Sequence, residues 1–209
     1  MNLLRPTPQI LRTKNQAPST NFPDAALVAG CRQGSATAQR ELYRRFAPRM
    51  LALCLRYVRH EFDAEDVLAR GFVKVFRGLG QFEGKGSLAG WVRRIMVHEC
   101  LSHLRRREAL TLRLEDCYTG HLATDLPAAD AELQAADLLR LVQELPAGYR
   151  TVFNLCALEG YTHPEVAELL GISEGTSKSQ LSKARAVLQR QVAALHSSMS
   201  TSYAHAHVA

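Results

Sequence analysis

The sequence predicts an all-α protein made of two small helical domains joined by a flexible linker. Three observations predict this class. Apolar residues recur at helical spacing over residues 24–107 and again over 130–195. Between these ranges, residues 108–129 hold Gly, Pro and Asp without a sustained period. No strand pattern and no internal repeat stands out in the 209 residues.

The first domain is expected over residues 23–107, after a flexible tail at 1–22. Its helices are predicted at about 24–33, from the cap candidate Ser35 onward, from the cap candidate Asp63 to Leu79, and from Ser87 to Arg107. Pro48 should kink the second helix. A turn rich in Gly separates the third helix from the fourth.

The second domain is expected over residues 130–195, followed by a flexible tail at 196–209. Its first helices are predicted at about 130–144 and 148–158. Two further helices should meet at Gly171, which suits the left-handed residue that ends a helix. Thr162 and Glu165 have the spacing of a capping box, and Ser173 is an N-cap candidate for the last helix.

This pair of helices forms a predicted helix-turn-helix, which makes the C-terminal domain a helix-turn-helix domain. Leu181, Ala184 and Leu188 should face inward. The other faces of the last helix hold polar and basic residues: Lys178, Ser179, Ser182, Lys183 and Arg185. The pattern fits a helix in the DNA major groove. The alternative is a surface helical hairpin with solvated charges.

Composition and charge favour a polyanionic partner. The chain is 46% apolar and 22% charged, which is ordinary for a globular protein, and its net charge is +6. No apolar stretch is long enough for a transmembrane helix. The first 20 residues lack the apolar core of a signal peptide. The expected location is therefore cytoplasmic.

Metal, cofactor and catalytic sites are not expected. The five cysteines are widely spaced and odd in number, as in a protein with reduced, packing cysteines. In the segment from His98 to His103, two candidate ligands at most share a helix face, which makes a poor zinc site. The acidic residues Glu61, Asp63 and Asp66 fit a solvated helix start. No P-loop, nucleophile elbow or dinucleotide fingerprint appears.

An aromatic and basic segment points to single-stranded DNA. Phe82 and Trp91 flank the Gly-rich loop, and Arg93, Arg94 and the run 105–107 follow. Aromatic rings stack on bases while Arg pairs with phosphates, and a flipped base could enter a pocket beside the loop. The alternative is that Trp91 is mainly a core residue and that the Arg run favours a helix C-terminus.

Four segments in order, 63–76, 82–107, 145–153 and 162–185, resemble the extracytoplasmic-function (ECF) sigma factors of bacterial RNA polymerase, the smallest members of the sigma-70 family. The resemblance spans about residues 24–195. It implies that the first domain binds core polymerase and the minus-ten promoter element. It implies that the second domain binds the minus-thirty-five element, and that an anti-sigma factor is a possible partner.

The resemblance also implies three sets of residues. The set for binding core polymerase is Asp63, Glu65, Asp66, Ala69, Arg70 and Val73. The set for binding the minus-ten element is Phe82, Trp91, Arg93, Arg94, His98, Arg105 and Arg106. The set for binding the minus-thirty-five element is Thr176, Lys178, Ser179, Ser182, Lys183 and Arg185.

Several positions depart from the family pattern. Ala69 and Arg70 stand where the family usually has Gln and Glu, so a reversed charge would face the polymerase clamp and weaken or adapt docking. Gly71 follows within the predicted helix, at a cost of about 1 kcal/mol relative to Ala. His98 replaces a usual Asn, and Ser177 replaces a common β-branched apolar residue.

Two other functions remain open from the sequence. A stand-alone helix-turn-helix regulator would bind duplex DNA without polymerase, but it would leave the aromatic and basic segment unexplained. The second alternative is an interaction module that no longer docks on polymerase, and Ala69 and Arg70 are the residues that indicate it. Co-purification with core polymerase separates this module from an active sigma factor.

Overall fold

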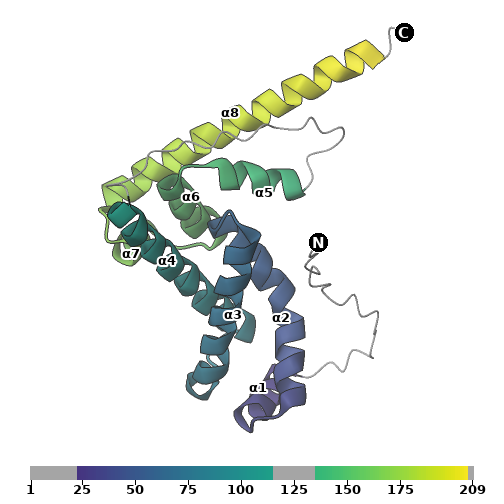
Figure 1. Cartoon of the computed structure of the whole chain (residues 1–209), viewed down its shortest axis with the longest axis vertical. Coiled ribbons are helices and arrows are strands. Elements are labelled where there is room, and N and C mark those ends of the chain that lie inside the picture. Colours follow the sequence, from purple (N-terminus) through teal and green to yellow (C-terminus); the bar gives the residue numbers. More distant parts are fainter. Residues whose placement is uncertain (1–22, 115–134, 207–209) are drawn as a thin grey trace, which may run out of the picture.

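The structure, a computed structural model, describes residues 23–114 and 135–206. The predicted tail 1–22 and most of the predicted linker 108–129 lie outside these residues. Every regular element within the described ranges is a helix or helical turn, and no strand occurs there. The all-α prediction is therefore confirmed, with one group of helices on each side of the gap (Figure 1).

The N-terminal group consists of four helices and one short turn. Its elements are α1 (Asp24–Arg32), α2 (Ala36–Tyr57), α3 (Glu61–Gly78), the 3-10 turn η1 (Leu79–Gln81) and α4 (Leu88–Leu114). Two predicted caps are present. The Ser35 hydroxyl accepts a hydrogen bond from the Ala38 N–H at 3.4 Å, and the Ser87 hydroxyl accepts one from the Gly90 N–H at 3.0 Å.

Two helix limits in this group differ from the sequence prediction. Helix α3 begins at Glu61 rather than at Asp63, because the acidic side chains of Glu61 and Asp63 both fit its first turn. Helix α4 continues to Leu114, beyond the predicted linker boundary at residue 107. Residues 105–107 therefore lie within α4 and do not form its C-terminus.

The core of this group lies where α2, α3 and α4 pack against one another, with α1 against α2. The stripe predicted on α2 is buried, including Leu42, Phe46 and Tyr57. On α3, Val67 and Leu68 are both buried. The apolar spacing in the sequence thus identified the buried faces of both helices.

The C-terminal group contains the predicted helix-turn-helix. Its elements are α5 (Ala135–Glu144), α6 (Ala147–Phe153), the π-helical turn η2 (Asn154–Leu158), α7 (His163–Leu170) and α8 (Glu174–Ala206). The capping box of Thr162 and Glu165 is present at α7. Gly171 ends α7 with φ +68°, and the Ser173 hydroxyl accepts the Thr176 N–H at 3.0 Å. These three local predictions are confirmed.

Helix α8 differs from the prediction of a helix ending near residue 195 and a tail at 196–209. The helix runs to Ala206, and its end projects beyond the other helices in Figure 1. The segment from Thr176 to Ala206 contains neither Gly nor Pro, the residues that most often end a helix. Its Ser- and His-rich composition was not sufficient evidence for a tail.

The two groups share one apolar core. The buried cluster of α1 to α4 continues into Val152, Leu155, Val166 and Leu181, and α2 packs on α5 and α6. No helix within the described ranges is both long and apolar enough to cross a membrane. The cysteines at 31, 54, 100 and 156 are free thiols, and Cys117 lies outside the described residues.

Candidate functional site

One face of α3 exposes the residues expected to bind core polymerase. Glu65, Asp66, Ala69 and Val73 are exposed, whereas Asp63 and Arg70 are partly buried. The set therefore lies along one helix, but not every member of it is open to a partner.

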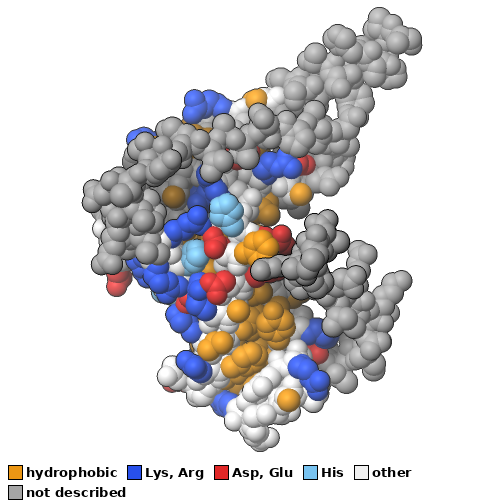
Figure 2. Space-filling model, viewed as in Figure 1, with side chains coloured by type: hydrophobic (Ala, Val, Ile, Leu, Met, Phe, Trp, Pro, Cys, Tyr) orange, Lys and Arg blue, Asp and Glu red, His pale blue; other side chains and the backbone are white. Residues whose placement is uncertain are grey.

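Large apolar side chains lie on the same surface. Phe62 is 86% exposed and Val73 47%. On the neighbouring α2, Tyr43 is 45% exposed, and its ring centroid lies 4.6 Å from that of the buried Phe72. Figure 2 shows hydrophobic side chains gathered over α2 and α3. Several exposed apolar side chains gathered on one side are typical of a protein-binding surface.

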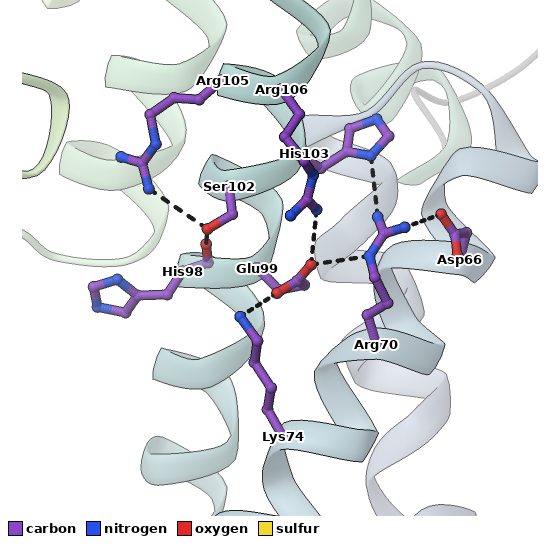
Figure 3. Close-up of polar contacts among 9 residues, drawn as sticks. All are labelled: Asp66, Arg70, Lys74, His98, Glu99, Ser102, His103, Arg105 and Arg106. Atoms are coloured by element: carbon purple, nitrogen blue, oxygen red, sulfur yellow. Dashed lines mark hydrogen bonds and ion pairs between the residues drawn. The ribbon is translucent and has the colours of Figure 1, made fainter.

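Arg70 does not present an unpaired charge to a partner. Its guanidinium pairs with Asp66 one turn earlier, donates to Glu99 on α4 at 2.9 Å, and lies 3.2 Å from Nδ1 of His103 (Figure 3). Asp66, on the preceding turn of α3, and Glu99, which also binds Lys74 and Arg106, partly compensate for the positive charge. Whether the reversed charge weakens or adapts docking on the clamp stays a prediction.

Glu99 is a buried carboxylate that sequence reasoning missed. Its side chain is 1% exposed and binds Arg70 at 2.9 Å, Arg106 at 3.0 Å and Lys74 at 2.5 Å. Burial alone would raise its pKa, but the hydrogen bonds from these three cations hold the pKa below the usual value. One signal could have identified it, since Glu99 continues the buried stripe of Val92 and Met96 at helical spacing.

Gly71 is explained by the packing of α4 on α3. A Cβ at residue 71 would lie 2.2 Å from Sδ of Met96, a side chain that is fully buried. The absence of a side chain at residue 71 therefore makes room for Met96. The cost in helix propensity is offset by this close approach.

The Gly-rich loop holds two aromatic rings together. The ring centroids of Phe82 and Trp91 lie 5.4 Å apart, and both side chains are partly buried against the core. Gly84 and Gly86 have φ angles of +75° and +96°, which other residues rarely adopt. Trp91 is thus packed in part as a core residue, in agreement with the structural alternative raised by the sequence.

Arg32 is a second residue that sequence reasoning missed. From α1, its guanidinium donates to the carbonyl oxygens of Leu79 at 3.0 Å and Phe82 at 2.5 Å. These bonds fix the start of the loop that carries Phe82. No local sequence signal connects Arg32 with a loop so far along the chain.

The remaining members of the minus-ten set are exposed cations or a histidine on α4. Arg93, Arg94, His98, Arg105 and Arg106 are all exposed. The ring of His98 is nevertheless partly desolvated, and this desolvation, together with the nearby charges of Arg94, Arg105 and Lys74, lowers its pKa. Figure 2 shows Lys and Arg side chains concentrated beside the apolar patch. This basic surface suits phosphate groups.

Two residues of this set are exposed but also contact the C-terminal group. Arg93 pairs with Glu159 and donates to the Leu158 carbonyl at 2.8 Å, and Arg105 donates to the Leu169 carbonyl at 3.3 Å. Glu159 has a side chain that is 1% exposed, and it also binds Arg56 at 2.7 Å. The basic surface of α4 is therefore partly covered by the helix-turn-helix group.

The minus-thirty-five set lies on the exposed side of α8. All six residues are exposed. An open groove of about 380 Å³ runs beside them, lined by His163, Lys178, Leu181, Ser182, Arg185, Ala186 and Gln189. Three members of the set, Lys178, Ser182 and Arg185, line this groove, so the structure brings cations and a hydroxyl donor together at one place. Such donors can contact base edges or phosphates.

Ser177 is buried and has a polar partner. Its hydroxyl lies 2.9 Å from Nδ1 of His163, and Sγ of Cys156 lies 3.8 Å from the same nitrogen. The hydroxyl at this usually apolar position is thereby satisfied. Within the described residues, no group of three or more His, Cys, Asp or Glu side chains is arranged to hold a metal ion.

Family models match both helical groups. The description "Sigma-70 region 2" matches residues 42–109, and "Sigma-70, region 4" matches residues 135–188. The chain is also similar to an ECF RNA polymerase sigma factor, SigM, of Mycobacterium tuberculosis. The two are 34% identical over 80% of this chain and 83% of that protein. An ECF RNA polymerase sigma-E factor of Haemophilus influenzae is 28% identical over 81% of this chain and 95% of its own length.

A solved structure has the same fold. It is the sigma factor RpoE of Bartonella quintana, in a co-crystal with the anti-sigma factor NepR. The similarity covers 73% of this chain and 95% of that chain, with a TM-score of 0.51 and 24% sequence identity.

Proposed function

The chain belongs to the ECF sigma factors of the sigma-70 family, and from this membership we propose which surfaces direct RNA polymerase to promoters. The α3 face with Phe62, Val73 and Asp66 docks on core polymerase. The loop 80–87 and the basic face of α4 engage the minus-ten element. The groove beside α8 engages the minus-thirty-five element.

The observation that carries this proposal is the presence of all three surfaces on one chain, in the order of the family regions. The apolar patch of α2 and α3 suits a protein partner, because it combines exposed Phe62 and Val73 with flanking charges. The basic faces of α4 and α8 suit DNA. A stand-alone regulator would need only the last of these surfaces.

The pairing of Arg70 makes its charge compatible with docking. Glu99 and Asp66 of this chain partly neutralise Arg70, so the reversed charge is not by itself a sign of a decayed interaction module. The proposal also includes a cytoplasmic location, no chemical reaction of its own, and an anti-sigma factor as regulator. A pull-down that recovered polymerase subunits alone would contradict the last point.

Core dependence tests the proposed function directly. Purified protein is mixed with core polymerase and passed over a sizing column, and binding of genomic promoter fragments is then measured with and without core. We expect co-elution with core and specific promoter binding only in its presence. Specific duplex binding by the protein alone, without co-elution, would identify a stand-alone regulator instead.

Two exposed residues of α3 provide the test of the docking surface. Phe62→Ala and Val73→Ala should weaken core binding without loss of fold, since neither side chain supports the core. Arg77→Ala, at another exposed position of the same helix, serves as the matched control. If Phe62→Ala and Val73→Ala bind core polymerase as tightly as the control Arg77→Ala, the docking surface lies elsewhere.

A further inference from the structure

The carboxylate of Glu99 joins cations from two helices. Arg70 and Lys74 come from α3, and Arg106 comes from α4 (Figure 3). Arg70 and Arg106 donate to the same oxygen, Oε1, at 2.9 and 3.0 Å, while Nζ of Lys74 lies 2.5 Å from Oε2. Both oxygens of this one group are therefore occupied by cations.

The three cations are much more exposed than the carboxylate that holds them. The side chains of Arg70, Lys74 and Arg106 are 37%, 56% and 55% exposed, against 1% for Glu99. An arginine has five N–H donors and a lysine has three, so each cation keeps donors that Glu99 does not use. Glu99 thus contacts each of the three cations, and Arg70 has two more partners, Asp66 and Nδ1 of His103.

The cations belong to two proposed surfaces. Arg106 is part of the α4 face proposed for the minus-ten element, whereas Arg70 lies on the α3 face proposed for core polymerase. Lys74 follows Arg70 by one turn of α3, and its charge contributes to lowering the pKa of His98 on α4. Glu99 therefore joins the two surfaces, alongside the pair of Arg107 with Asp63 and the contact of Arg70 with His103.

We propose that Glu99 is a positioning residue that holds Arg106 and Lys74 in place for the DNA backbone and couples them to Arg70 on the docking face. This inference rests on the proposed function. Lys74 thereby joins the DNA-binding surface as a phosphate contact on α3. A long side chain loses rotamer freedom when it binds, and prior fixation by Glu99 reduces that loss at the moment of binding.

A double-mutant cycle of Glu99→Gln and Arg106→Gln tests the coupling. Binding of a promoter fragment by the reconstituted holoenzyme is measured over a range of salt concentrations. In the wild-type background, Arg106→Gln should weaken binding about tenfold and reduce the salt slope by about one. In the Glu99→Gln background, the same change should weaken binding by only about twofold, because Arg106 is no longer positioned.

Arg94→Gln is the matched control, because Arg94 is exposed on α4 and is not among the cations that bind Glu99. Its effect should be the same in both backgrounds. If Glu99 has only a structural role, Glu99→Gln should reduce the effects of Arg94→Gln and Arg106→Gln on promoter binding alike, or it should change only the melting temperature. The inference would be overturned if Arg106→Gln weakens promoter binding by the same factor in the wild-type and the Glu99→Gln backgrounds.

A second cycle covers the case in which Glu99→Gln does not fold. Arg70→Gln and Arg106→Gln alter two surface side chains that share Oε1 of Glu99. We expect their combined effect on DNA binding, at saturating core, to differ from the product of the single effects by about threefold or more. A combined effect equal to the product of the two single effects would overturn the inference. A wild-type holoenzyme that binds no promoter would overturn the proposed function, and this inference with it.

Discussion

Residues 70 and 71 of α3 each fit a residue of α4. Arg70 meets Glu99, and Gly71 leaves space for Met96. Taken along the chain alone, the two positions read as a reversed charge and a weak point in a helix. Their partners lie on another helix, so only the packing of α3 on α4 explains them.

The fit of Gly71 and Met96 predicts a coupled effect on stability. Gly71→Ala should lower the free energy of unfolding despite its better helix propensity, because the new Cβ would lie 2.2 Å from the Met96 sulfur. Met96→Ala should cost about 2–5 kcal/mol. The double variant should be less destabilised than the sum of both, since the added methyl group meets a cavity. Additive losses in denaturant titrations would contradict this packing.

Glu99 predicts a dependence of stability on pH. Its pKa in the folded protein is below the ordinary value of 4.5, so its contribution is fully present above that value. The contribution is lost as the pH falls through the lower, folded-state pKa. The free energy of unfolding of the wild type should therefore be about 2 kcal/mol higher than that of Glu99→Gln at neutral pH. The difference should narrow below pH 4.5. A constant difference from neutral to acid pH would show that Glu99 is not the titrating group.

At the scale of the helix, local chemistry determines how the helix-turn-helix begins and ends. The capping box at Thr162, the left-handed Gly171 and the Ser173 cap were all predictable, because each depends on residues within one turn. The ends of α4 and α8 were not predicted. Neither boundary carries a Gly or Pro, so composition alone suggested a linker and a tail where the helices continue.

The exposed side of α8 predicts separate effects of its cations on promoter use. Lys178→Ala and Lys183→Ala should each weaken minus-thirty-five binding and reduce the salt slope by about one, as expected for lost phosphate contacts. Arg190→Ala is the control, because Arg190 is an exposed cation of the same helix that is not in the minus-thirty-five set and donates to the Ala186 carbonyl. Wild-type promoter use by both Lys variants would show that this face does not bind DNA.

At the scale of the whole molecule, the two helical groups are joined by polar contacts that the sequence did not indicate. Glu159 binds Arg56 of α2 and Arg93 of α4, and the Asn154 amide donates to the Arg56 carbonyl at 2.8 Å. These partners are far apart along the chain, and no pattern in the sequence pairs them. The order of the groups was predictable, but their contact was not.

The proposed assignment of the two DNA-binding surfaces predicts that this contact opens when both promoter elements are bound. The names of the elements place them about 25 base pairs apart, which is about 85 Å of duplex at a rise of about 3.4 Å per base pair. In the structure, Arg105 of α4 touches the Leu169 carbonyl of α7, in the helix that precedes α8. If α4 and α8 bind the two elements as proposed, we expect the two groups to separate when both elements are engaged.

Glu159→Gln should favour the separated arrangement. The change removes the negative charge that holds Arg56 and Arg93, and both cations then gain from returning to solvent. Small-angle scattering should give a larger radius of gyration for this variant than for wild type. Glu41→Gln, which alters only a surface pair with Arg44 within α2, is the control. Identical scattering of all three proteins would show that Glu159 does not hold the groups together.

Run-off transcription tests whether this protein directs RNA polymerase to promoters. The purified protein is added to core polymerase from the source organism on a pool of genomic promoter fragments. We expect transcripts that depend on this protein and start at a fixed distance from shared minus-ten and minus-thirty-five sequences. The sigma-factor function would be contradicted if the folded protein binds duplex DNA by itself and the transcripts are identical to those of core polymerase alone.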